Sequence, residues 1–168
     1  MASRDPKALI IGHSFVKRLF RDIRVGFDAR VNLQLGLTGT ALVKWHGVGG
    51  RCVETLRSYD LGVIRSYAPE IVILELGTND LSHSRPEVVG SDIDDLVVLF
   101  LSHFKVRVVG WCCVISRGLS HSNAALFEQR AALLNNYLRV VLRVFLIVGI
   151  IVFSITPLKI IIYRMVFI

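Results

Sequence analysis

The sequence lacks the features that mark a secreted, disulfide-bonded protein. It has only three cysteines in 168 residues, two of them adjacent at Cys112 and Cys113, and no Asn-x-Ser/Thr sequon for glycosylation. An adjacent pair and one distant cysteine make a poor disulfide framework. The only apolar run near the N-terminus, Ala8–Ile11, is shorter than the apolar part of a signal peptide and is typical of a strand. These absences favour a reducing, cytoplasmic location.

The chain also lacks a concentrated stripe of positive charge. Its net charge of +7 comes from 20 basic and 13 acidic residues, but the last acidic residue is Glu128, and three basic residues follow position 142. Up to that position the chain therefore has 17 basic residues against 13 acidic ones and is only mildly basic. The densest basic cluster, within residues 17–24, has the spacing of one solvated helix face. No specific nucleic-acid binding is predicted.

What the sequence does contain is an alternation of strands and helices, which is the pattern of a parallel α/β sheet covered by helices. Four strands are predicted, at Ala8–Ile11, at either Val31–Leu37 or Ala41–Trp45, at Ile71–Leu76 and at Val106–Val109. Four helices are predicted at Phe15–Ile23, from Gly50 to about Tyr67, from a capping box at Ser84–Glu87 to Phe104, and from Leu126 to Val141.

Polar or glycine-rich segments follow three of these strands at the point where each strand ends. Ser14 opens the first helix, Gly47–Gly50 follows the second strand, and Asn79 follows the third. Ligands bind at the carboxyl ends of parallel strands, and a helix N-terminus at that place favours negative charge. The pattern therefore indicates a hydroxyl nucleophile at Ser14, with a glycine N–H and the Asn79 amide available to stabilise an oxyanion.

Each of these segments also has a purely structural interpretation. Ser14 could be a helix N-cap. Gly47–Gly50 could be only a backbone turn, because it has neither the glycine spacing of a dinucleotide site nor the lysine of a P-loop. Asn79 could begin an Asx-type turn in which Asp80 caps the next segment. The convergence of three such segments on one crevice favours the functional interpretation.

At these residues the chain resembles the SGNH, or GDSL-type, hydrolases. Gly12-His13-Ser14 is similar to their block I, Gly49-Gly50 to block II, and Gly77-Thr78-Asn79-Asp80 to block III, and the resemblance covers about residues 7–142. It implies a three-layer α/β/α, flavodoxin-like fold with a parallel sheet, and serine-dependent hydrolysis of an ester or related acyl bond.

The resemblance also implies roles for individual residues. Ser14 is expected to be the nucleophile, and its own N–H, the Gly50 N–H and the Asn79 side-chain amide are expected to form the oxyanion hole. The implied substrate is a small ester or an acylated molecule. No cofactor and no metal is expected.

The sequence departs from the family pattern in two places. Block I normally reads Gly-Asp-Ser, and His13 stands where the Asp would be. Block V, an Asp-x-x-His that supplies the general base and its orienting carboxylate, has no counterpart, since the last Asp is Asp95 and the last His is His121. His13, His46, His83 and His121 remain candidates for a substitute base. We therefore expect impaired hydrolysis, and the alternative is a non-catalytic binding module that keeps the crevice.

The last part of the chain, residues 143–168, differs in composition from the rest. Val144–Leu158 is a run of fifteen uncharged residues, slightly shorter than the roughly 17–25 residues of a membrane span. Three interpretations are open: a truncated or divergent end foreign to the domain, a membrane anchor within residues 144–168 that would make the protein membrane-associated, and a last buried strand at Val144–Ile151. The sequence thus divides into a domain at 1–142 and an apolar tail at 143–168.

Overall fold

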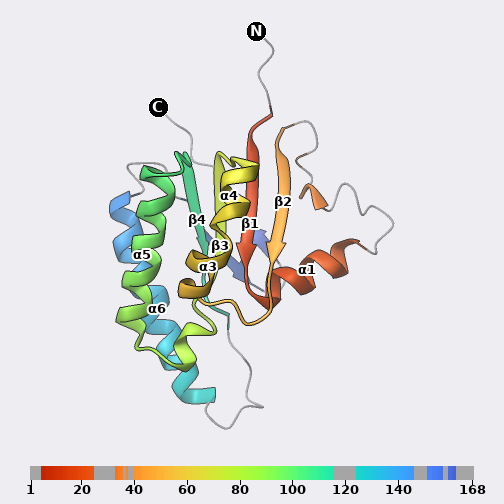
Figure 1. Cartoon of the computed structure of the whole chain (residues 1–168). Helices are drawn as coiled ribbons and strands as arrows, with labels where there is room; N and C mark the ends of the chain where they lie inside the picture. The colour runs from red at the N-terminus through yellow and green to blue at the C-terminus, as the bar shows by residue number, and fades with distance from the viewer. Residues whose placement is uncertain are drawn as a thin grey trace.

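The described residues form a sheet covered by helices on both faces. A computed structural model of the whole chain (Figure 1) describes residues 5–24, 33–35, 37, 40–115, 124–145, 151–156 and 159–161. In these residues a six-stranded sheet has the order β2-β1-β3-β4-β5-β6. The strands are β1 (Lys7–Gly12), β2 (Leu42–Gly47), β3 (Ile71–Glu75), β4 (Val108–Cys112), β5 (Ile151–Thr156) and β6 (Lys159–Ile161). Neighbouring strands from β2 to β5 pair in parallel, and β6 pairs antiparallel with β5.

Two separate cores show which helices cover which face. The helices are α1 (Ser14–Arg24), α3 (Val53–Tyr59), α4 (Leu61–Tyr67), α5 (Pro86–Ser102) and α6 (Ala124–Phe145). Leu9 and Ile11 of β1 belong to the larger core, which packs under α3 to α6, whereas Ala8 and Ile10 belong to a smaller core with Val16 of α1. This alternation is the period of two that a strand imposes on its side chains. The predicted three-layer α/β/α fold is confirmed.

The strand predictions hold with small shifts, and the second strand is now decided. The segment Ala41–Trp45 was the correct alternative, because β2 occupies Leu42–Gly47. The competing segment Val31–Leu37 is wrong as a strand at residues 33–35, which form a helical turn, while residues 31, 32 and 36 lie outside the described part. The fourth strand begins at Val108, two residues later than predicted.

Two helix predictions need correction. The single helix expected from Gly50 to Tyr67 is broken at Asp60, which ends α3 and precedes α4. The capping box predicted at Ser84 is also wrong, since Arg85 is the N-cap, its backbone is extended (φ −68°, ψ 149°) and Pro86 is the first helical residue. A residue before proline avoids the helical region, which moves the start of the helix past Ser84.

The predicted division at residue 142 falls inside α6, which continues to Phe145. A strand follows the helix, but it begins at Ile151 and not at Val144, and it pairs with Gly110 to Cys112 of β4. Residues 146–150, 157–158 and 162–168 lie outside the described part. No helix in the described part is both long and apolar enough to cross a membrane. The boundary at residue 142 stays a prediction.

Candidate functional site

The three predicted site segments leave the sheet side by side. Gly12, at the end of β1, is in register with Gly47 of β2 on one side and with Glu75 of β3 on the other. Ser14, Gly50 and Asn79 follow these three strand ends within two to four residues. Because the strands are adjacent and parallel, the three segments lie at the same carboxyl-terminal end of the sheet.

Two glycines allow the elements at this end of the sheet to approach closely. A Cβ atom on Gly12 would lie 2.3 Å from the carbonyl oxygen of Glu75, and one on Gly47 would lie 2.2 Å from the backbone nitrogen of Lys17. Any side chain at either position would force the backbones apart. Gly47 therefore brings the end of β2 against the first turn of α1.

Ser14 is the first residue of α1, and the preceding residue caps the helix. The Nδ1 atom of His13 accepts a hydrogen bond from the backbone N–H of Phe15 (3.1 Å). The backbone carbonyl of His13 accepts another from the N–H of Lys17 (3.3 Å). The interpretation of Ser14 as N-cap is therefore wrong, because His13 performs that role. Within the described part of the chain, no hydrogen bond is found at the Ser14 hydroxyl.

Gly50 lies in a turn that needs glycine for its backbone conformation. Its φ is +73°, in the left-handed region, and the space around its missing Cβ is open. Glycine adopts this region without steric cost. The turn is fastened to β1 by a hydrogen bond from Val48 N–H to the carbonyl of Gly12 (3.0 Å).

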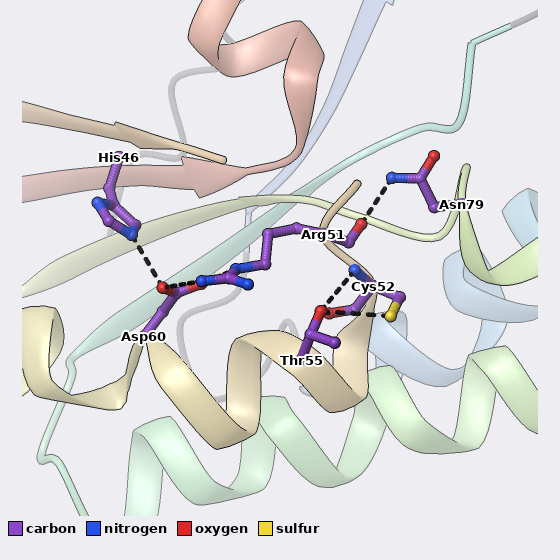
Figure 2. Close-up of polar contacts among 6 residues, drawn as sticks. All are labelled: His46, Arg51, Cys52, Thr55, Asp60 and Asn79. Carbon is purple, nitrogen blue, oxygen red and sulfur yellow. Dashed lines mark hydrogen bonds and ion pairs between the residues drawn. The ribbon is translucent and has the colours of Figure 1, made fainter. Parts of the chain in front are cut away.

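The loop after β3 is hydrogen-bonded directly to the loop after β2. Nδ2 of Asn79 donates to the carbonyl of Arg51 (2.8 Å, Figure 2), and the backbone N–H of Val53 donates to Oδ1 of Asp80 (2.9 Å). Asn79 does begin a local turn, the 3-10 segment Asp80–Ser82, but its side chain makes no cap bond there, and the Asp80 carboxylate accepts from the first residue of α3. Burial raises the pKa of Asp80, against the opposing effect of the Val53 N–H. The structure thus brings Asn79 to the residue next to Gly50.

Sequence reasoning missed a buried polar cluster behind this loop (Figure 2). The Asp60 carboxylate, only 4% exposed, accepts hydrogen bonds from Nε and Nη2 of Arg51 and lies 3.1 Å from Nε2 of His46. Burial alone would raise the pKa of Asp60, but the hydrogen bonds from Arg51 and His46 outweigh it and lower the pKa. Asp60 in turn raises the pKa of Arg51. The sequence signal for this cluster was Asp60, an acidic residue in the middle of an otherwise continuous helix pattern.

A second buried pair joins β1 to β3. Nε2 of His13 lies 3.0 Å from Oε1 of Glu75, and these residues are only 5% and 3% exposed. Nδ1 of His13 accepts from Phe15, whereas Nε2 is close to the Glu75 carboxylate without hydrogen-bond geometry and has no hydrogen-bond partner among the described residues. The charged residue within the apolar run Ile71–Leu76 was a signal for such a partner, because buried carboxylates are seldom left unpaired.

Solved structures that match this architecture include esterases and lipases. AlinE4, an SGNH-hydrolase family esterase, matches with a TM-score of 0.64 and 17% identity, covering 90% of this chain and 77% of its own. The acetyl xylan esterase AlAXEase matches at 0.60 and 17%, covering 87% and 76%. A GDSL-like lipase from Bacteroides thetaiotaomicron matches at 0.62 and 12%, covering 90% and 72%. The chain has the SGNH-hydrolase fold. No family model and no curated protein matches the sequence.

Within this SGNH fold, the histidines considered as a substitute base lie as follows. Nδ1 of His13 accepts a hydrogen bond from Phe15 and its Nε2 lies 3.0 Å from Glu75, while Nε2 of His46 faces Asp60. His83 is exposed, and His121 lies outside the described residues. In the part of the chain that the structure describes, none of these is seen paired with Ser14, and no group of three metal-ligand side chains is arranged to hold an ion.

Proposed function

We propose that this chain is an SGNH-type, esterase-like domain for a small ester or acylated molecule. Ser14 is the nucleophile, and its own N–H, the Gly50 N–H and the Asn79 side-chain amide stabilise the oxyanion. Hydrolysis is impaired, since the Asp-x-x-His that supplies the base in this family has no counterpart in the sequence. The acyl chemistry rests on the blocks that the sequence shares with the family and on the esterases and lipases that share its fold.

The observation that carries the proposal is the pair of hydrogen bonds between the loops after β2 and β3. The Asn79 amide and the Arg51 carbonyl are 2.8 Å apart, which keeps the side chain of Asn79 beside the Gly50 turn. That turn is itself bonded to the end of β1, two residues before Ser14. Preorganised donors of this kind stabilise developing negative charge without having to move during the reaction.

A serine hydroxyl without a positioned base is a weak nucleophile at neutral pH. Removal of a triad member still leaves roughly 10³–10⁴-fold acceleration over water, which comes from the oxyanion hole and substrate binding. We therefore expect slow or undetectable hydrolysis of p-nitrophenyl acetate by the full chain. Any activity should disappear in Ser14→Ala and persist in Ser66→Ala, a matched change on the exposed face of α4.

Two results would contradict this account. Turnover at ordinary enzyme rates, about 1–10³ per second, would reveal an unrecognised base. Single alanine changes at His13, His46, His83 and His121 should then identify it. Activity that survives Ser14→Ala would refute the assignment of the nucleophile.

The second candidate function is a non-catalytic binding module that retains the crevice for an acyl or glycan ligand. It is favoured by the Ser14 hydroxyl, at which no hydrogen bond to a described residue is found. A fluorophosphonate probe separates the two functions, because it reacts with an activated serine and not with an ordinary one. Probe adduct on Ser14, located by mass spectrometry, supports the esterase-like function, whereas binding of ligands without any adduct supports the module.

A further inference from the structure

Arg51 takes part in both the candidate oxyanion site and the buried polar cluster. Its carbonyl accepts the hydrogen bond from Nδ2 of Asn79, and its guanidinium makes two hydrogen bonds to the Asp60 carboxylate. Figure 2 shows the side chain reaching from the loop toward Asp60 while the backbone turns toward Asn79. One residue thus links the Asn79 amide to a buried carboxylate on another element.

The three members of the cluster come from three elements that surround the Gly50 turn. His46 is the penultimate residue of β2, just before the turn; Arg51 directly follows Gly50; and Asp60 sits at the break between α3 and α4. The Asp60 side chain is 5% exposed and that of Arg51 is 18% exposed, so the contact is largely shielded from water. A bidentate contact between an arginine and a carboxylate fixes the relative orientation of the two groups as well as their distance.

We propose that Asp60, Arg51 and His46 act together as positioning residues, which hold the Gly50 turn and the Asn79 amide in place for an oxyanion before any ligand binds. The oxyanion role rests on the proposed function, whereas the positioning itself does not. None of the three side chains needs to touch the ligand.

The first test uses NMR on the full chain to follow the side-chain amide of Asn79 and the backbone amide of Val53. Asp60→Asn and Arg51→Met should each shift the side-chain amide signals of Asn79. Each should also raise the hydrogen-exchange rate of the Val53 amide about tenfold relative to amides of β3. The double variant should add little to either single change, because both remove the same contact. His46→Gln, which can still donate to Asp60, should retain the wild-type signals, and His46→Phe should not.

Leu138→Ala is the control for a general loss of stability. Leu138 is fully buried in α6 and is not a member of the Asp60, Arg51 and His46 cluster, so this change should destabilise the fold without shifting the Asn79 signals selectively. Unchanged Asn79 signals in both Asp60→Asn and Arg51→Met would overturn the proposal. So would additive effects in the double variant, which would mean that Asp60 only ends a helix.

A second measurement separates this proposal from the assignment of Ser14. If wild-type Ser14 reacts with a fluorophosphonate, the rate constant should fall about tenfold or more in Asp60→Asn and remain unchanged in Leu138→Ala. An unaltered rate in Asp60→Asn would contradict the positioning role. If wild-type Ser14 does not react at all, the assigned nucleophile fails, and the NMR signals of Asn79 still decide the positioning role.

Discussion

A His13→Ala variant is expected to lose about 1–3 kcal/mol of stability, the range for leaving a buried polar group without its neighbouring partner. Glu75 would remain inside the sheet with only 3% exposure and without the imidazole 3.0 Å away. The helix cap on Phe15 would be lost as well, at a cost of roughly 1 kcal/mol. Total stabilities of small domains are about 5–15 kcal/mol, so the change removes a large part. Urea unfolding at pH 7 measures it.

The matched variants test whether His13 and Glu75 compensate for each other. Glu75→Gln in the His13→Ala background should recover much of the loss, because no buried charge is then left unpaired. His13→Asp introduces the residue typical of the family, yet it should destabilise at least as much as alanine, since it places two carboxylates together. If His13→Asp leaves the stability unchanged or increases it, the contact between His13 and Glu75 does not contribute to the stability of the fold.

Removal of residues 146–168 is expected to abolish cooperative unfolding. The truncation leaves α6 complete but deprives β4 of its partner along Gly110 to Cys112. A central strand would become an unprotected sheet edge, which invites self-association. Trp111, fully buried on that strand, reports the change through its fluorescence during urea unfolding.

Cooperative unfolding of the truncated chain would instead show that the strands in the tail are not needed for the fold. A soluble 1–145 fragment that unfolds in one sharp transition, with the midpoint of the full chain, would show that β5 and β6 are not part of the domain. The predicted division between a domain and a foreign or divergent end would then be supported. Extending the fragment to residue 161 serves as the control, because it restores both strands.

The fold was largely predictable because it depends on local patterns. Apolar runs located β1 and β3 within a residue at each end, and helical spacing located α5 and α6. Errors arose where a distant partner decides the outcome. Asp60, at the break, contacts Arg51 and His46, nine and fourteen residues away, and no local propensity encodes those contacts.

The candidate site was predictable in its residues but not in its connections. Ser14, Gly50 and Asn79 could be proposed from their places after three strands, and the structure puts those strands side by side. The Asn79 side chain was expected to act locally or on a ligand, and its bond to the Arg51 carbonyl spans 28 residues. His13 was considered as a base, although its partner Glu75 is on another strand. Such pairings follow from tertiary packing, which a single sequence does not specify.

The central claim is that Ser14, Gly50 and Asn79 face one point. A crystal structure of the full chain tests it most directly, through the distance from the Ser14 hydroxyl to Nδ2 of Asn79 and the direction of the Gly50 N–H. We predict hydrogen-bonding or one-water separation, roughly 3–5 Å, with the Gly50 N–H directed at the same point. An Asn79 amide that faces away from Ser14, beyond the reach of a side chain, would contradict the esterase-like function.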